Sequence, residues 1–170
     1  MIQETQPSPK AMVVYGSVFG NTEKIARALS RGIQRHCIVD CLNIRDADPK
    51  KFAEYGLIAI GAPTQKHTAY EPMKDFLSEL EGMKDLAGVP GFAFDTKFDM
   101  PLSGSAAKYI EKRLEELGFK IFAPRASAIV SGGMKDNVLR DGEEARFERI
   151  GDEIGSALAN LTEIKASETR

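Results

Sequence analysis

Short apolar runs alternate with amphipathic stretches along most of this chain, and this alternation constrains the fold more than any other feature. Ile25, Leu29 and Ile33, for example, repeat at helical spacing. Continuous apolar strands are typical of a sheet covered on both faces, and alternating strands and helices indicate parallel strands joined by right-handed crossovers. We therefore predict an α/β fold with five parallel strands between two helical layers, with strands near residues 12–15, 37–42, 57–60, 89–94 and 121–130, the last split by Pro124.

Helix punctuation supports this interpretation at several positions. Asp48 followed by Pro49 predicts a capped helix start, because proline is well tolerated at the first helical position. Ser103 or Ser105 is a candidate cap for a later helix, and Gly118 is a candidate for its end.

The length fits one domain, since 170 residues lie within the usual range of about 100–200 residues per domain. We expect this domain over residues 11–161, between a flexible polar tail at 1–10 and a polar tail at 162–170. Apolar runs of about six residues are far shorter than the ~18–20 needed to cross a bilayer. A net charge of −2 lacks the basic excess of nucleic-acid-binding proteins. We therefore expect a cytoplasmic protein with neither a membrane span nor a nucleic-acid partner.

The loops after the predicted strands are where a ligand is expected. In an open parallel sheet the ligand crevice lies outside the carboxyl ends of the strands, where strand order reverses. The loop 16–22 offers glycine backbone N–H groups together with hydroxyl and amide side chains, and it leads straight into a helix. Because a helix N-terminus adds about half a positive charge, the loop suits a phosphate group. An ordinary glycine-rich turn with a helix cap is the other interpretation of the loop alone.

Other phosphate-binding and catalytic patterns do not fit. The P-loop needs a lysine where Asn21 stands, and the dinucleotide fingerprint needs a glycine where Val18 stands. A receiver domain needs clustered acidic residues after the first strand, where Tyr15 and Gly16 lie. The sequence has no carboxylate pair, Ser-His-Asp order or metal-ligand cluster at suitable spacing, and only two histidines. We therefore predict neither catalytic nor metal-binding residues.

Several segments together resemble the flavodoxin family. Residues 17–22, Ser-Val-Phe-Gly-Asn-Thr, match four of the five defined positions of its [ST]-x-[ST]-G-N-T phosphate loop, and Phe19 is the departure. Residues 61–64, Gly-Ala-Pro-Thr, resemble the segment that follows the third strand in that family. The stretches 71–80, 106–118 and 143–161 align in order, so the resemblance covers about residues 11–160.

The resemblance implies a flavodoxin-like sheet in the order 2-1-3-4-5, flavin mononucleotide (FMN) as cofactor, and transfer of single electrons between redox partner proteins, a reductase and an electron acceptor. It implies a monomer or weak dimer. The phosphate would lie on the loop 17–22, and the loops after the third and fourth strands would cover the two faces of the flavin ring. The implied cofactor-binding residues are Ser17, Val18, Phe19, Gly20, Asn21, Thr22, Pro63, Thr64, Gln65, His67, Tyr70, Asp95, Thr96, Lys97, Phe98 and Gly104.

Within these loops the chain departs from the family, because it has no tryptophan. Stacking on the flavin would fall to Tyr70 or Phe98, both of which offer a flat apolar face, although each also suits packing within its own loop. His67 could hydrogen-bond the flavin and make its potential depend on pH, or it could be a solvated loop residue. Lys97 could favour the anionic reduced flavin or point into water.

Three functions stay open at this point: a flavodoxin-like electron carrier, an FMN-dependent NAD(P)H:quinone-type reductase, and a flavin-free binding module. Flavodoxins are usually strongly acidic, whereas the loops here mix Lys66 and Lys97 with Glu71, Asp95 and Asp99. We therefore expect a less negative potential for the second reduction step than is usual in the family, and weaker electrostatic steering of partners.

Overall fold

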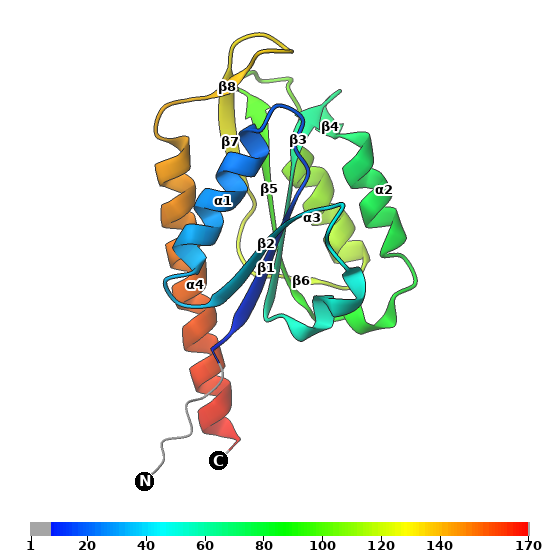
Figure 1. The fold of residues 1–170 in the computed structure, drawn as a ribbon. Helices are drawn as coiled ribbons and strands as arrows, with labels where there is room; N and C mark the ends of the chain where they lie inside the picture. Colours follow the sequence, from blue (N-terminus) through cyan, green and yellow to red (C-terminus); the bar gives the residue numbers. More distant parts are fainter. Residues whose placement is uncertain (1–7, 170) are drawn as a thin grey trace.

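Strands and helices alternate through residues 8–169, the part of the chain that the computed structural model describes. Figure 1 shows a twisted sheet with helices on both sides. The strands are β1 (Lys10–Tyr15), β2 (Ile38–Asn43), β3 (Leu57–Gln65), β4 (Thr68–Ala69), β5 (Pro90–Phe98), β6 (Lys120–Ile121), β7 (Ala126–Ser131) and β8 (Val138–Leu139). The helices are α1 (Asn21–Ile33), α2 (Glu71–Glu79), α3 (Ala106–Glu116) and α4 (Glu143–Glu168), with short 3-10 helices η1 (Pro49–Glu54) and η2 (Lys84–Leu86).

Five parallel strands in the order β2-β1-β3-β5-β7 form the centre of the sheet. This is the predicted order 2-1-3-4-5, which is confirmed. The fifth predicted strand is two strands, because β6 and β7 pair separately with β5 and Pro124 lies between them. Two additions are antiparallel: β8 extends the sheet beyond β7, and β4 pairs with the end of β3.

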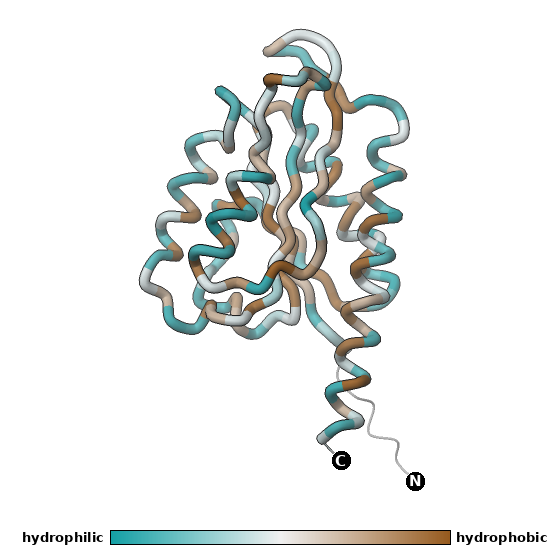
Figure 2. Tube along the Cα trace, turned by 180° about the vertical axis from the view of Figure 1, so that it is seen from behind, coloured by the Kyte–Doolittle hydropathy of each residue, from teal (hydrophilic) through white to brown (hydrophobic). Residues whose placement is uncertain are grey.

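Both faces of the sheet are buried, as the apolar runs predict. Met12 and Val14 of β1 join the core beneath α2 and α3, whereas Val13 and Tyr15 join the core beneath α1 and α4. Successive side chains of a strand point to opposite faces, so a strand covered on both sides must be apolar throughout. Figure 2 shows apolar residues along the strands and polar residues over much of the outer helix surfaces.

The two helices on the second face touch through glycines. A side chain at Gly32 of α1 would overlap the backbone of Glu148, and one at Gly151 of α4 would overlap the backbone of Leu29. The absence of side chains therefore lets the two backbones meet, which fixes α1 against α4. The position of α1 matters because its first turn forms one end of the candidate site.

The helix ends confirm most of the predicted punctuation. Asp48 accepts a hydrogen bond from the backbone N–H of Lys50 at 3.0 Å, although the helix it caps is the 3-10 helix η1. Ser105, not Ser103, caps α3 by accepting from the Lys108 N–H at 3.1 Å. Gly118 follows α3 with a φ of 93°, a conformation that glycine adopts without strain.

The termini differ in part from the expected tails. Helix α4 continues to Glu168, so residues 162–168 extend a helix where a polar tail is expected. Lys10 already belongs to β1, while residues 1–7 of the expected N-terminal tail lie outside the described residues. Neither α4 nor any other helix within residues 8–169 has the length and apolar character that a membrane crossing needs.

Candidate functional site

The loops that follow the parallel strands gather at one end of the sheet, the upper end in Figure 1. These loops follow β1, β3, β5 and β7, and the fourth of them continues into β8. The strand order reverses between β1 and β3, because the chain adds β2 on one side of β1 and then adds β3, β5 and β7 on the other side. This is the place where an open parallel sheet offers a ligand crevice.

The loop after β1 forms a tight turn that presents the N-terminus of α1. The backbone N–H of Gly20 donates to Ser17 Oγ at 3.1 Å. Gly20 has a φ of 87°, in the left-handed region that favours glycine, and α1 begins at the next residue. The first backbone N–H groups of a helix have no acceptor within the helix, so they point out of its end as donors.

The Asn21 and Thr22 side chains, both predicted to hold phosphate, are engaged with other protein groups. Asn21 Nδ2 donates to the main-chain oxygen of Asn137 at 3.0 Å and to its Oδ1 at 2.8 Å. The Thr22 hydroxyl lies 2.9 Å from that of Thr96, and both residues are buried. The anion-binding capacity of this loop therefore resides mainly in the backbone N–H groups at the start of α1.

A groove of about 410 Å³ opens beside this loop. It lies within the range of about 300–1,000 Å³ for small-molecule sites. Its walls come from all four loops, and they include flat aromatic groups, methionines, a lysine pair and polar side chains. The lining residues are Phe19, Pro63, Thr64, Gln65, Lys66, His67, Thr96, Lys97, Phe98, Met100, Ser103, Val130, Met134 and Asn137.

A larger hollow, of about 520 Å³, lies elsewhere between α4 and the β6–β7 segment. Its walls are mostly apolar, with Phe92, Phe122 and Ile154 among them and Glu153 as the only charged residue. A phosphate-bearing ligand needs donors, which this hollow does not provide. The groove at the carboxyl ends of the strands is therefore the candidate site.

Tyr70 is not among the residues that line the groove, and its expected stacking on a flavin stays a prediction. Tyr70 is 9% exposed and packs in the core, where its hydroxyl occupies the space beside Gly16 that a side chain would fill. Burial raises the pKa of Tyr70 above its ordinary value. Phe98 and Phe19 are the aromatic side chains in the groove, and Phe19 is 48% exposed.

Asp95 is also absent from the groove wall, because its carboxylate is fully buried. Asp95 Oδ2 accepts hydrogen bonds from Thr64 Oγ1 at 3.2 Å, Ser105 Oγ at 2.7 Å and the Ala107 N–H at 2.9 Å. Its Oδ1 has no hydrogen-bond partner among the described residues. A carboxylate at a helix N-terminus is favoured by the helix dipole. The Asp95 carboxylate thus anchors α3 and two groove loops, and the expectation that Asp95 contacts the cofactor stays a prediction.

His67 and Gly104 join the same two loops at the groove mouth. His67 Nδ1 donates to the main-chain oxygen of Leu102 at 2.6 Å, which assigns the ring proton to Nδ1 in the neutral form. The backbones of His67 and Gly104 pair as an isolated bridge. Gly104 has a φ of 73°, and a side chain there would overlap the His67 backbone. The loops after β3 and β5 therefore form one connected wall.

The predicted residues divide into those in the groove, those beside it and those that support it. Groove residues are Phe19, Pro63, Thr64, Gln65, His67, Thr96, Lys97 and Phe98. Ser17, Val18, Gly20, Asn21 and Thr22 belong to the adjoining loop and helix start, whereas Tyr70, Asp95 and Gly104 support the walls. The lining residues that were not predicted are Lys66, Met100, Ser103, Val130, Met134 and Asn137.

Comparison with known proteins assigns the fold and the family. The family model described as flavodoxin matches residues 13–150. An uncharacterised protein of Methanocaldococcus jannaschii is 26% identical over 133 residues, which are 70% of this chain but 33% of that protein. A probable flavodoxin of Bacillus subtilis is 28% identical over 117 residues, 66% of this chain and 73% of that protein. A solved flavodoxin from the domain Archaea superposes with a TM-score of 0.72 at 26% identity, covering 88% of this chain and 98% of that one.

Proposed function

The chain belongs to the flavodoxin family, a family of FMN-binding electron-transfer proteins, and on this premise we propose that it binds FMN in the groove and shuttles single electrons between redox proteins. The observation that carries the proposal is the groove itself, which opens at the strand-order reversal beside the first turn of α1. Bound FMN supplies the redox chemistry, because a flavin accepts and releases electrons singly.

The residues present fit FMN. A volume of about 410 Å³ suits a ligand of this class. Phe19 and Phe98 offer flat apolar surface within the groove, in place of the absent tryptophan. The backbone N–H groups of Asn21 and Thr22 at the start of α1 would hold the phosphate, and the loop 16–22 contains no acidic side chain to repel it.

The protein's own groups have three tasks in this function. The wall made by the loops after β3 and β5 orients the ring and excludes water from its faces, and Asp95 keeps both loops in place. The Asn21–Asn137 hydrogen bonds hold the loop after β7 against the phosphate end. Lys66 and Lys97 line the groove without a carboxylate partner among residues 8–169, and they would favour negative charge on a reduced flavin.

The electron carrier is favoured over the NAD(P)H-dependent reductase by the open mouth of the groove. Leu102 and Met134 stand there 84% and 85% exposed, so a partner protein can reach the groove directly. The near-neutral charge and the two free cysteines accord with a cytoplasmic monomer or weak dimer, which we propose as its state.

Three measurements on the purified protein test the proposal. We expect a flavin absorption spectrum after incubation with FMN, stoichiometric reduction by dithionite, and negligible oxidation of NADH or NADPH by the holoprotein alone. Failure to take up FMN in a fluorescence titration would remove the cofactor assignment. Rapid turnover of NAD(P)H with a quinone would instead establish the reductase.

The lysines in the groove give a quantitative test of its electrostatics. We expect Lys97→Gln to make the second reduction potential more negative, by roughly 30–60 mV if the lysine contributes about 0.7–1.4 kcal/mol to the reduced state. Potentiometric titration of both holoproteins measures this difference. An unchanged potential would show that the Lys97 charge is screened by water.

A further inference from the structure

Most of the large apolar side chains that the fold leaves exposed surround the mouth of the groove. Eight such residues are exposed within residues 8–169, and Ile38 and Ile164 are the two that lie elsewhere. The other six are on the loops after β1, β5 and β7 and on β8. We call these six the apolar rim: Val18, Phe19, Met100, Leu102, Met134 and Val138.

An apolar rim of this composition is typical of a protein-binding surface. Singly scattered apolar residues are normal on any protein, but a cluster around one opening marks an interaction site. Methionine and aromatic residues are enriched in the cores of protein interfaces, and flexible methionines adapt to a partner's shape. Met100 and Met134, at 59% and 85% exposure, are free to do so.

The charges around the rim have the opposite sign to the whole chain. The four segments 16–20, 63–70, 96–104 and 131–140 carry four Lys or Arg residues and two Asp residues, a net charge of +2 in a chain of −2. Asp99 is paired with Arg140 at 3.1 Å. This leaves three lysines without an ion pair among the described residues, which we call the cationic rim: Lys66, Lys97 and Lys135.

The acidic residues near these lysines in the sequence do not neutralise their charge at the groove mouth. Asp95 is buried beneath α3, where it accepts three hydrogen bonds. Glu71 pairs with Lys74 at 3.1 Å at the start of α2. Asp136, and Asp141 immediately after the fourth segment, are the exposed carboxylates near the loop after β7 that form no ion pair among the described residues, so the three lysines still outnumber them. The mixture of charges in the loops thus resolves into a surface with excess positive charge.

We propose that the groove mouth docks an acidic electron-transfer protein, whose carboxylates pair with the cationic rim while its apolar centre covers the apolar rim. The inference rests on the proposed function, because it concerns the partner that exchanges electrons at this groove. Complementary charge raises association rates by about 10–1,000-fold at low salt and selects among partners. The FMN phosphate brings negative charge to the α1 end of the site, so the test uses the holoprotein.

Salt dependence of electron transfer reports the sign of the docking surface. The reduced holoprotein is mixed in a stopped-flow instrument with cytochrome b5 as an acidic acceptor, and separately with cytochrome c as a basic one. Salt is varied from about 0.01 M to about 1 M, over which the Debye length falls from ~30 Å to ~3 Å. We expect the rate with cytochrome b5 to fall at least about tenfold, and the rate with cytochrome c to stay level or rise. Salt slopes are compared because the two acceptors differ in driving force.

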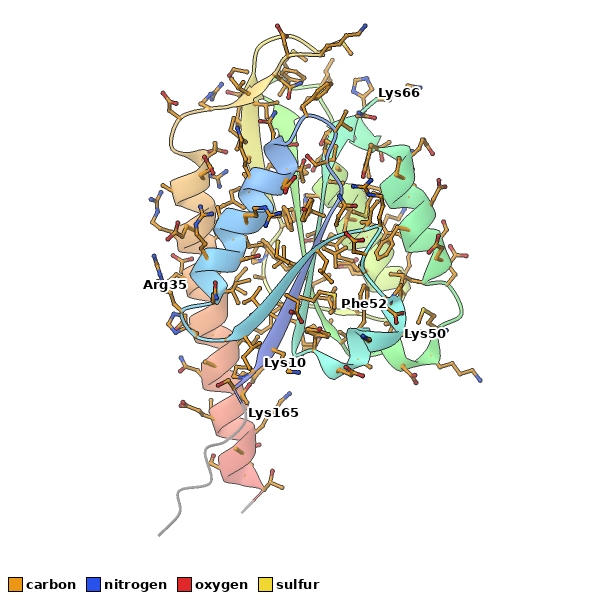
Figure 3. The ribbon with its side chains drawn as sticks, viewed as in Figure 1. Lys10, Arg35, Lys50, Phe52, Lys66 and Lys165 are labelled. Atoms are coloured by element: carbon orange, nitrogen blue, oxygen red, sulfur yellow. The ribbon has the colours of Figure 1, made fainter. Side chains whose placement is uncertain are left out.

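Matched charge reversals locate the effect. The double variant Lys66→Glu, Lys135→Glu changes the net charge of the four segments from +2 to −2, so it should lower the low-salt rate with cytochrome b5 at least about tenfold and reverse the sign of its salt slope. The control Lys50→Glu, Lys165→Glu makes the same change of charge at the opposite end of the molecule, as Figure 3 shows, and should leave both rate and slope unchanged. Leu102→Ser should lower the rate at high salt too, because it removes apolar rather than electrostatic contact.

The outcomes separate this inference from the proposed function. FMN content and affinity are measured for each variant by flavin fluorescence, so that lost cofactor is not mistaken for lost docking. A wild-type protein that takes up no FMN overturns the proposed function and the inference together. A wild-type holoprotein whose rate with cytochrome b5 rises with salt overturns the inference and leaves the electron carrier intact. The same holds if the rim and control variants behave alike.

Discussion

Replacing Asp95 by alanine should destabilise the fold strongly, because its buried carboxylate holds together the start of α3 and two groove loops. The substitution removes the acceptor of three hydrogen bonds, from Thr64, Ser105 and the backbone N–H of Ala107. Leaving a buried backbone N–H unpaired costs about 1–3 kcal/mol, and each half-buried hydroxyl loses roughly 0.5–1.5 kcal/mol. Loss of the anion at the α3 N-terminus adds about 0.3–1 kcal/mol. Relief of the unpaired Oδ1 offsets part of this, and we expect a net loss of about 3–5 kcal/mol.

Urea unfolding followed by circular dichroism measures this loss. With a slope of about 2 kcal/mol/M, the midpoint of Asp95→Ala should fall by roughly 1.5–2.5 M. Asp95→Asn keeps an oxygen acceptor in place and should lose no more than about 2 kcal/mol. The matched control, Asp75→Ala, removes an exposed carboxylate on α2 and should stay within about 0.5 kcal/mol of wild type.

The reasoning is refuted if Asp95→Ala shifts the midpoint by less than about 0.5 M, or if the asparagine variant is as unstable as the alanine variant. The former would mean that water or rotated hydroxyls replace the lost acceptor. FMN affinity gives a second readout, since Asp95→Asn should weaken binding less than Asp95→Ala does.

Three further predictions follow from the site and its supports. Gly104→Ala should cost at least about 1–3 kcal/mol and weaken FMN binding, because it combines a φ of 73° with overlap on His67; thermal unfolding and flavin fluorescence measure the two effects. Asn21→Asp should weaken FMN binding by at least about 1–3 kcal/mol in a fluorescence titration, since it adds negative charge beside the phosphate. Hydrogen bonds from Arg146 lower the pKa of Glu143 below its ordinary 4.5. The wild-type protein should therefore be more stable than Glu143→Gln above about pH 4.5, and this difference in the free energy of unfolding should vanish as the pH falls further.

The first of these predictions has a control within the chain, and each of the other two has a result that would contradict it. Gly82 has a φ of 79° but open space around it, so Gly82→Ala isolates backbone strain from overlap. Unchanged FMN affinity in Asn21→Asp would remove the phosphate assignment from the start of α1. A Glu143→Gln difference that grows on acidification would contradict the direction of the pKa shift.

The sequence predicts the fold well because the decisive signals are local. Apolar runs such as 57–60 specify strands covered on both faces, and the family resemblance supplies their order. Ser105 marks the start of α3 through the hydrogen bond that its side chain accepts, and Gly118 marks the end through its freedom to adopt a positive φ. The structure differs from the expectation at residues 162–168. Their apolar periodicity is too weak to predict a helix, but they continue helix α4 from its well-packed preceding turns.

The candidate site is less predictable, because its walls depend on contacts between distant segments. From the sequence, Tyr70 is expected in a loop that faces the ligand. In the structure it lies in the core, in the space that the absent side chain of Gly16 leaves free. Asp95 is an implied cofactor-binding residue in the sequence, and nothing local in the sequence shows that the start of α3 closes over its carboxylate. Met134 and Asn137 lie in the loop after β7, and ligand sites form at the carboxyl ends of parallel strands, so this loop could have been included in the predicted site. Gly132, which has a positive φ, is the sequence signal for the turn that brings the loop over the groove.

The glycine contact between α1 and α4 carries a consequence for synthesis of the chain. Gly32 and Gly151 meet across about 120 residues of sequence. A ribosome adding about 5–20 residues per second needs roughly 6–24 s to make that interval. During this time the helix that begins at Asn21 lacks the brace that fixes it. The start of α1, where we propose that the phosphate binds, is therefore braced only after Gly151 has been made, although it is encoded first.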